Sequence, residues 1–402
     1  MCKITIIDSM MGTGKTSWAI DKMSNDDNNS YIYITPYLTE IQRIKTSITD
    51  KRFYEPVNVG NGKLDSLHNL LLKNKDIAST HALFKMSSDA TKELLKANNY
   101  ILILDEVMDV IEQVKLKKDD LKLLLDNELI SIDGNNNNMV VWNKDKLDIS
   151  TKYDDIKQMC LNNNIYMVNN TLFMWTFPVD IFKTFKEVYI LTYLFDGQIQ
   201  KYYYDLYNIN YEYKSIHKQN NKYIIGEYIN KYDMAQIKNR INIINDNINN
   251  IGRNEFSLSS SWYKKDKNKL LIEQLKNHTY NYFNNKIKGQ SKYNMWTTFK
   301  AQQNKITGNG YRRGFVSLTA RATNDYCNKY NLAYLSNIYF NPLVKQFFID
   351  RKVNVNEDIY ALSELIQWVW RSRIRIDDND LYINLYIPNS RMRNLLMEWL
   401  NS

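Results

Sequence analysis

The residues of this chain best suited to chemistry stand near its first residue, in the segment Ser9-Met-Met-Gly-Thr-Gly-Lys-Thr16. The segment matches the phosphate-binding pattern G-x-x-x-x-G-K-[ST], except that Ser9 replaces the first glycine. Glycines let backbone N–H groups converge on phosphate oxygens, and the start of a following helix adds partial positive charge. The predicted nucleotide-binding residues are Gly12, Thr13, Gly14, Lys15 and Thr16. In this pattern Lys15 reaches the β- and γ-phosphates, and the Thr16 hydroxyl ligates Mg²⁺.

A pair of carboxylates, Asp105 and Glu106, directly follows the apolar run Tyr100–Leu104. Such a run predicts a buried strand, and its end places a carboxylate at the same sheet edge as the phosphate-binding loop. We predict that Asp105 holds Mg²⁺ and that Glu106 activates the attacking water as a general base. Taken alone, an Asp-Glu pair indicates a solvated strand end, and the loop upstream is what favours the catalytic interpretation.

A third group of candidate residues lies in Gln367-Trp-Val-Trp-Arg-Ser-Arg-Ile-Arg375. On a predicted helix over 358–375, Gln367, Arg371 and Arg375 are four residues apart and share one face. Arginines packed this densely favour an anionic partner, and a triphosphate would make one of them an arginine finger. The alternatives are a helix facing a nucleic-acid backbone and a solvated run of charge.

The elements that must position these residues follow an alternating pattern. Short β-branched or apolar runs predict strands, and helical stretches separate them, which is typical of a parallel α/β sheet. In the first half we predict strands over 3–8, 31–35, 77–84, 100–104, 171–178 and 188–194, with helices over 16–23 and from 37 to 48. In the second half we predict strands over 256–262, 314–318 and 381–387, with helices over 266–283, 358–375 and 391–400.

Composition and charge divide the chain near residue 195. The 402 residues carry a net charge of +9, but residues 1–195 hold 23 Lys and Arg against 26 Asp and Glu. Residues 196–402 hold 30 against 18. Codon bias explains a high lysine content but not this asymmetry, so the second half is predicted to face a polyanion. We expect one domain over residues 1–195, with the loop and the carboxylates, and a basic second domain over 196–402.

Other function classes find little support in the sequence. No run of about 18 apolar residues is present, so no membrane span is predicted. The glycine turn interrupts the first apolar stretch of the chain, whereas a signal peptide would need that stretch to continue. Cys2, Cys160 and Cys327 are far apart and odd in number, which fits neither a disulfide framework nor a zinc site. A cytoplasmic protein is expected.

The three groups of residues, in this order, resemble motifs I, II and VI of the superfamily 2 DExx helicases. The box Asp105-Glu-Val-Met108 fits the DExx class, and the loop is similar to that of small phage replication helicases and, distantly, of the herpesvirus origin-binding helicase. The resemblance implies two tandem RecA-like domains with parallel central sheets, a P-loop NTPase that uses ATP and Mg²⁺. It also implies a nucleic-acid strand across both domains.

Weaker matches supply candidate nucleic-acid contacts. Motif Ia would correspond to 34–37 with Thr35, and motif Ib or Ic to 79–81 with Thr80 and His81. Motif V would correspond to 317–324, with Arg321, Thr323 and Asn324. The competing interpretations are a buried, hydrogen-bonded His81 and a helix start capped by Thr323 or Asn324. Lys264, Lys265, Lys267 and Lys269 form a basic cluster that is either a strand-tracking patch or a solvated face.

The sequence departs from the helicase pattern in two places. The second arginine of motif VI falls on Ile374, so Arg371 is the direct match and either Arg373 or Arg375 is the finger. The upstream glutamine motif that holds adenine in DEAD-box RNA helicases has no counterpart. The expectation is a DNA helicase or translocase in the host cytoplasm of a phage, acting on single-stranded or forked DNA with other replication proteins. The alternatives are a ring-forming or DNA-packaging ATPase and an RNA helicase.

Overall fold

The computed structural model describes residues 2–58, 60, 62–319, 325–376, 378 and 380–402. The chain divides into two compact units. Unit 1 contains residues 1–228 and 341–355, and unit 2 contains residues 229–340 and 356–402. Of the helices in the described ranges, none combines the length and the apolar character that crossing a membrane requires.

A seven-stranded sheet forms the centre of unit 1. Its order is β12-β11-β1-β10-β4-β2-β3, and every neighbouring pair is parallel except β11 and β12. The strands are β1 (Lys3–Asp8), β2 (Tyr31–Thr35), β3 (Ile77–Thr80), β4 (Ile101–Asp105), β10 (Glu187–Thr192), β11 (Glu212–Gln219) and β12 (Lys222–Gly226). The four strands predicted at 3–8, 31–35, 100–104 and 188–194 are therefore confirmed. Strands β2 and β4 are buried along their whole length, as continuous apolar runs should be in a covered parallel sheet.

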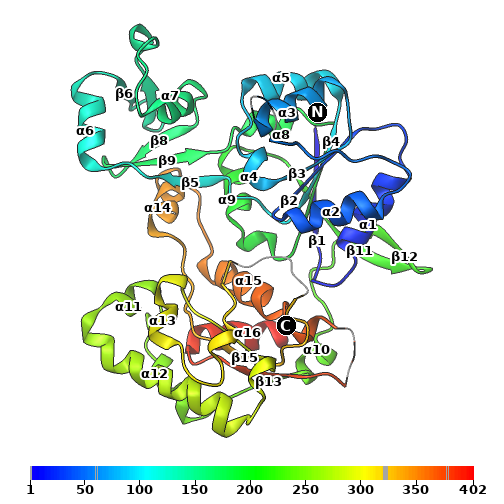
Figure 1. Cartoon of the computed structure of the whole chain (residues 1–402), viewed down its shortest axis with the longest axis vertical. Helices are drawn as coiled ribbons and strands as arrows, with labels where there is room; N and C mark the ends of the chain where they lie inside the picture. The colour runs from blue at the N-terminus through cyan, green and yellow to red at the C-terminus, as the bar shows by residue number, and fades with distance from the viewer. Residues whose placement is uncertain (1, 59, 61, 320–324, 377, 379) are drawn as a thin grey trace. The chain divides into compact units, whose positions relative to one another are not determined.

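Helices cover this sheet (Figure 1). They are α1 (Lys15–Ser24), α2 (Leu38–Ser47), α3 (Lys63–Leu72), α4 (His81–Phe84), α5 (Asp89–Asn98), α8 (Val179–Lys183) and α9 (Ile199–Leu206). The core under α1 and α2 combines Trp18, Ile41 and Ile44 with strand residues such as Tyr33 and Ile103. This packing fixes α1 against the sheet, and with it the loop that precedes α1.

Residues 111–176 form a second sheet that the sequence patterns did not predict. It is antiparallel, with the order β5-β9-β8-β7-β6. The strands are β5 (Ile111–Val114), β6 (Ile130–Asp133), β7 (Met139–Trp142), β8 (Ile165–Val168) and β9 (Leu172–Thr176), and the helices are α6 (Lys118–Asp126) and α7 (Asp154–Leu161). A separate core cluster holds them together. The run at 171–178 is therefore a strand, but it belongs to this sheet and not to the parallel one.

Helix α14 (Pro342–Asp350) comes from late in the sequence but packs on the inserted sheet (Figure 1). Phe347 is fully buried and meets Tyr166 of β8 with ring centroids 5.9 Å apart. The guanidinium carbon of Arg351 lies 3.8 Å from the Phe347 ring centroid, and Arg351 Nη2 donates to the Asn137 carbonyl over 2.7 Å. The chain therefore joins the two units at three points in the sequence, near residues 228, 340 and 355.

A four-stranded, wholly parallel sheet forms the centre of unit 2. Its order is β13-β16-β15-β14, from β13 (Ile241–Ile243), β14 (Asn294–Thr297), β15 (Asn331–Tyr334) and β16 (Ile383–Tyr386). One rung is a ladder of side-chain amides, in which Asn242 donates to Asn384, Asn384 to Asn331 and Asn331 to Asn294, over 2.9, 3.1 and 3.1 Å. Since each amide needs its neighbour in register, the ladder specifies the strand alignment.

The helices of unit 2 are α10 (Ala235–Asn239), α11 (Ser260–Lys264), α12 (Lys269–Asn281), α13 (Gln303–Ile306), α15 (Glu357–Val369) and α16 (Ser390–Leu400). The predicted strand at 381–387 and the helices at 266–283 and 391–400 are confirmed within a few residues. The strands predicted at 256–262 and 314–318 are wrong. Ser259 caps α11 instead, through its side-chain oxygen and Trp262 N–H, and the second segment makes only one bridge, from Phe315 to Trp296.

The expected domain boundary at residues 195 and 196 falls inside unit 1. Residues 196–226 follow β10 and supply α9, β11 and β12, and β11 pairs with β1 along Thr5, Ile6 and Ile7. Sheet pairing therefore carries unit 1 past the point where the composition changes.

Candidate nucleotide-binding site

The candidate site is built on the edge of the seven-stranded sheet where its parallel strands end. Backbone pairing aligns Asp8 with Thr192 and aligns Leu191 with Asp105. Strand β10 therefore stands between β1, which leads into the glycine loop, and β4, which ends in the carboxylate pair. Parallel strands present their carboxyl ends together, and ligands of open α/β sheets bind at this edge.

The loop from Ser9 to Gly14 has a backbone shape that requires glycine. Gly12 and Gly14 adopt φ values of 84° and 90°, and Gly14 is the N-cap of α1. Lys15 Nζ donates to the carbonyls of Ser9 and Met10, the second over 3.1 Å, so the ammonium group lies against the loop itself. A side chain added at Gly12 would meet nothing within 4 Å, which leaves space over the loop.

Ser9, the departure from the usual first glycine, has a structural role. Its side chain is fully buried, and Ser9 Oγ accepts a hydrogen bond from the Ile216 N–H of β11 over 2.8 Å. Next to it, Ser215 Oγ donates to the Asp8 carbonyl over 2.9 Å. The loop is therefore tied to β11 through the hydroxyl of the serine that stands in place of the glycine.

Asp105 is buried at the end of β4 and accepts a hydrogen bond from the Tyr33 hydroxyl over 2.6 Å. Burial raises the pKa of Asp105 to about 7, while the Tyr33 hydrogen bond opposes the shift and the charge of Glu106 adds to it. A cation beside this carboxylate would offset the cost of its buried charge. Tyr33 is a site residue that the sequence patterns did not reveal.

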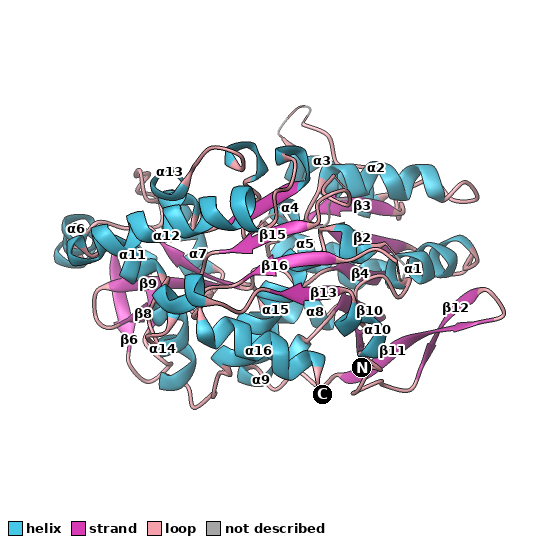
Figure 2. Ribbon diagram, turned by 90° about the horizontal axis from the view of Figure 1, so that it is seen from below, coloured by secondary structure: helices cyan, strands magenta, loops and turns pink. Residues whose placement is uncertain are grey.

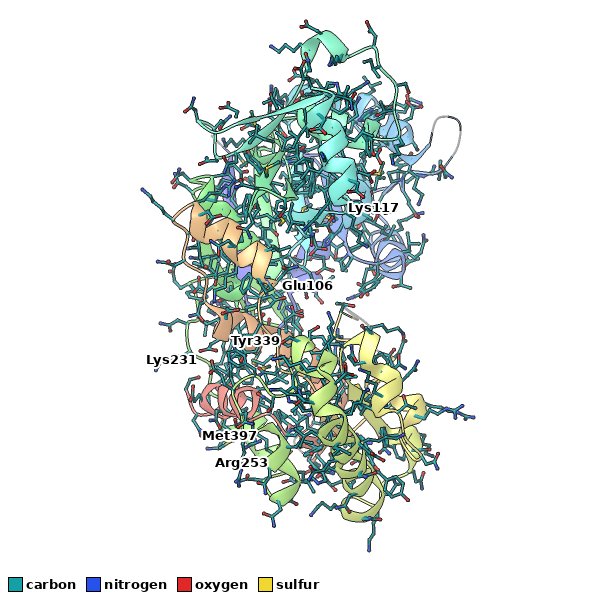
Figure 3. All side chains as sticks on the ribbon, turned by 90° about the vertical axis from the view of Figure 1, so that its left-hand side faces the viewer. Glu106, Lys117, Lys231, Arg253, Tyr339 and Met397 are labelled. Atoms are coloured by element: carbon teal, nitrogen blue, oxygen red, sulfur yellow. The ribbon has the colours of Figure 1, made fainter. Side chains whose placement is uncertain are left out.

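Glu106, labelled in Figure 3, follows directly. Its backbone φ is 72°, which is uncommon for a residue with a side chain. Its N–H donates to the Leu191 carbonyl over 3.0 Å, so β10 holds this turn in place. Backbone strain of this kind concentrates at functional sites, where the fold holds a side chain in a particular direction. The Glu106 side chain is half-buried.

Two buried hydroxyls flank the carboxylate and have no hydrogen-bond partner within the residues that the structure describes. They are Thr35 Oγ1 at the end of β2 and Thr192 Oγ1 at the end of β10. Unsatisfied buried hydroxyls are costly and therefore suggest a ligand or ordered water. Over the same residues, His, Cys, Asp and Glu form no group of three or more that could hold a metal by themselves. The residues fit Mg²⁺ held by one carboxylate, one hydroxyl and the phosphates of a nucleotide.

Asp8 is a further buried carboxylate of this edge that the sequence patterns did not reveal. It is 3% exposed and accepts hydrogen bonds from the Leu194 and Phe195 N–H groups over 2.9 and 3.0 Å. Burial raises the pKa of Asp8 to about 6, and these two bonds only partly offset the shift. Asp8 thereby shapes the turn after β10, where Leu194 adopts a φ of 55°.

The weaker nucleic-acid candidates have mixed placements. Thr80 is the N-cap of α4 and accepts a hydrogen bond from the Leu83 N–H over 3.3 Å, while His81 is buried. Thr80 therefore has a local structural role, and the His81 side chain is largely out of contact with solvent. The predicted contacts Arg321, Thr323 and Asn324 lie outside the described residues.

The predicted single helical face for Gln367, Arg371 and Arg375 is wrong. Helix α15 ends at Val369, and Arg375 belongs to a separate 3-10 helix over Arg373–Arg375. The Arg371 guanidinium is buried and donates to the carbonyls of Ser317 and Leu318, over 3.2 and 3.4 Å. The Arg371 side chain is therefore held by carbonyls more than fifty residues away in the sequence, which a local pattern cannot foresee.

The other two arginines differ in their surroundings. The Arg373 guanidinium carbon lies 3.9 Å from the Tyr330 ring centroid, whereas Arg375 is exposed.

A basic groove of about 380 Å³ runs along α12 in unit 2. Its lysines are Lys264, Lys265, Lys269, Lys276 and Lys305, and Asp266 and Glu273 are also among its lining residues. Three of the four lysines in the predicted basic cluster, Lys264, Lys265 and Lys269, therefore line a concave surface. Lys269 also pairs with Asp266 over 3.0 Å.

Comparisons with solved structures identify the fold. The chain is similar over its full length to the structure "XPD_Helicase", with a TM-score of 0.52 and 12% identity, covering 95% of that chain. It is also similar to the Xpd4 structure from S. tokodaii, with a TM-score of 0.51 and 12% identity, covering 98% of this chain and 94% of that one. At these identities the likeness concerns the fold, and it confirms the expected α/β class with tandem RecA-like domains.

Sequence comparison identifies the family. Residues 111–175 match the YonV middle domain, which corresponds to the inserted antiparallel sheet, and residues 235–400 match the YonV C-terminal Rossmann-like domain. The SPbeta prophage-derived protein YonV of Bacillus subtilis strain 168 is 43% identical over 417 residues, covering 100% of both chains. The chain therefore belongs to the YonV family.

Proposed function

We propose that this protein is an ATP-dependent DNA helicase or translocase that serves phage DNA replication or recombination. The observation that carries the proposal is the shared sheet edge. Gly12 and Gly14 adopt left-handed conformations in the loop after β1, and two strands away Asp105 ends β4 and Glu106 follows it. A helicase fold supports the same activity, and the prophage relative supports the phage setting.

In this proposal the loop N–H groups and Lys15 hold the phosphates, and Thr16 and Asp105 would hold Mg²⁺. The metal, when bound, neutralises charge that develops on the phosphates. Glu106 accepts a proton from the attacking water, and its fixed backbone turn directs the carboxylate for that task. Domain movements that accompany ATP hydrolysis would then advance the protein along a strand.

Gln367 and the arginines after α15 are proposed to act on the same triphosphate. Arg375 is the better candidate for the finger because its side chain is exposed, whereas Arg371 donates to two carbonyls and Arg373 stacks on Tyr330. For Arg371 we propose a positioning role, since its bonds hold the segment that contains Ser317 and Leu318.

The nucleic-acid surface is proposed to include the basic groove along α12, together with Thr80, Arg321, Thr323 and Asn324. Thr35 and His81 are left out of this surface, because their side chains are buried. Lysines that line a concave surface can track a phosphate backbone without reading sequence. Because such contacts release counterions, binding through the groove should weaken steeply as salt increases.

The proposal is tested by steady-state ATP hydrolysis with and without single-stranded DNA, compared with single-stranded RNA. Lys15→Ala should abolish turnover, and Glu106→Gln should retain ATP binding but lose turnover. Turnover that rises with DNA and disappears in Lys15→Ala would support the motor. Turnover indifferent to DNA and RNA would refute the helicase, and preferential stimulation by RNA would refute the assignment to DNA.

A further inference from the structure

The hairpin formed by β11 and β12 stands beside the glycine loop, on the side opposite to the carboxylates. In the sheet, β10 and β4 lie on one side of β1, and β11 and β12 lie on the other. Under the proposed function the terminal phosphate lies toward Asp105 and Glu106, at the end of β4. The nucleoside end of the ligand must then extend away from β4, toward β11 and β12.

The hairpin extends past the end of β1, at the edge of the sheet where the glycine loop begins (Figure 2). Strand β11 pairs with β1 up to Lys214, opposite Ile7, and then continues to Gln219. It turns through Asn220 and Asn221, whose φ values are 49° and 59°, into β12. The hairpin therefore rises alongside the loop that follows β1, and the Ser9–Ile216 hydrogen bond fixes its base there.

The ring of Tyr223 on β12 lies directly against Gly14. A side-chain carbon added at Gly14 would stand 2.3 Å from Tyr223 Cε1, a distance that real atoms cannot adopt. The ring is half-buried and packs partly against the core cluster that contains Trp18 of α1. Lys218 is the residue paired with Tyr223 across the hairpin, and it is exposed. Directly paired residues share one face of a sheet, so an aromatic ring and a cation stand together near the loop.

We propose that Tyr223, with Lys218 beside it, forms the contact for the base of the bound nucleoside triphosphate. This inference rests on the proposed function, in which the loop binds the phosphates, and it assigns Tyr223 and Lys218 to the base. An aromatic face stacks on a nucleobase without requiring base-specific hydrogen bonds. When the aromatic residue of one such contact is replaced by alanine, affinity for the ligand falls about tenfold.

The experiment compares two ligands that share phosphates but differ in the base. AMP-PNP and inorganic tripolyphosphate, each with Mg²⁺, are titrated into the full chain by calorimetry. Tyr223→Ala should weaken AMP-PNP binding about tenfold and leave tripolyphosphate binding unchanged within about twofold, while Tyr223→Phe should bind both like the wild type. The control is Ile224→Ala, a truncation on the other face of the same hairpin, which should bind both ligands normally.

The outcomes separate this inference from the function on which it rests. Unchanged AMP-PNP binding by Tyr223→Ala would overturn the base contact and leave the proposed function intact. Equal weakening of both ligands would also overturn it, because Tyr223 would then act by shaping the loop. Wild-type protein that binds neither ligand would overturn the proposed function, and the base contact with it.

Discussion

The buried carboxyl group of Asp8 should make the stability of unit 1 depend on pH, and Asp8→Asn isolates that dependence. The side chain is 3% exposed, and burial raises its pKa to about 6 despite two backbone hydrogen bonds. An aspartate in an unfolded chain has a pKa of about 3.9. The folded chain therefore holds this proton more tightly than the unfolded chain.

The sign and size of the effect follow from this difference. Since the folded pKa is the higher one, the Asp8 contribution to stability is greatest at low pH and falls as pH rises through the window from about 4 to about 6. Two pKa units correspond to about 3 kcal/mol in total. Between pH 4.5 and 7.5, where most of the titration takes place, the free energy of unfolding should fall by about 2 kcal/mol relative to Asp8→Asn.

The assay is urea unfolding of wild type and Asp8→Asn, followed by circular dichroism across this pH range. The asparagine adds a constant offset, because Oδ1 can still accept a hydrogen bond while Nδ2 faces a backbone N–H of Leu194 or Phe195. Only the slope of the difference against pH is informative. Asp27→Asn, a change of an exposed residue in the same unit, is the control and should give no comparable slope.

Two results would refute the reasoning. A difference that stays constant with pH would mean that Asp8 titrates alike in folded and unfolded chains. A wild type that gains stability relative to Asp8→Asn as pH rises would mean that the two N–H bonds outweigh burial.

The remaining predictions concern packing and the arginines. Asn331→Leu should lower the free energy of unfolding of unit 2 by about 2–4 kcal/mol, because it leaves buried amide groups of Asn294 and Asn384 unsatisfied; unchanged denaturant midpoints would contradict this. Phe347→Ala removes a fully buried ring from α14 and should lower the free energy of unfolding by about 3–5 kcal/mol. The loss should be detected as faster hydrogen exchange in α14 and β8, and unaltered exchange there would show that the ring does not hold the helix. Arg371→Lys loses hydrogen bonds to two carbonyls and should destabilise unit 2 by about 2 kcal/mol in thermal unfolding; a stable variant would argue against the positioning role.

The sequence alone determined the features that depend on residues close together in the chain. The glycine loop, the apolar runs of β2 and β4 and the carboxylates after β4 were all identified, because conformational preferences and burial patterns within one segment are enough to recognise them. The helix predicted over 391–400 corresponds to α16 for the same reason, and Met392 and Trp399 are among its buried residues.

Only the tertiary structure decided the features that depend on residues far apart in the chain. Arg371 lies past the end of α15, and carbonyls more than fifty residues away accept its hydrogen bonds. Pairing between β1 and β11, some two hundred residues apart, brought Tyr223 to Gly14 and extended unit 1 past residue 195. Such contacts depend on which strands pair and in which register, and a local pattern of residues predicts neither.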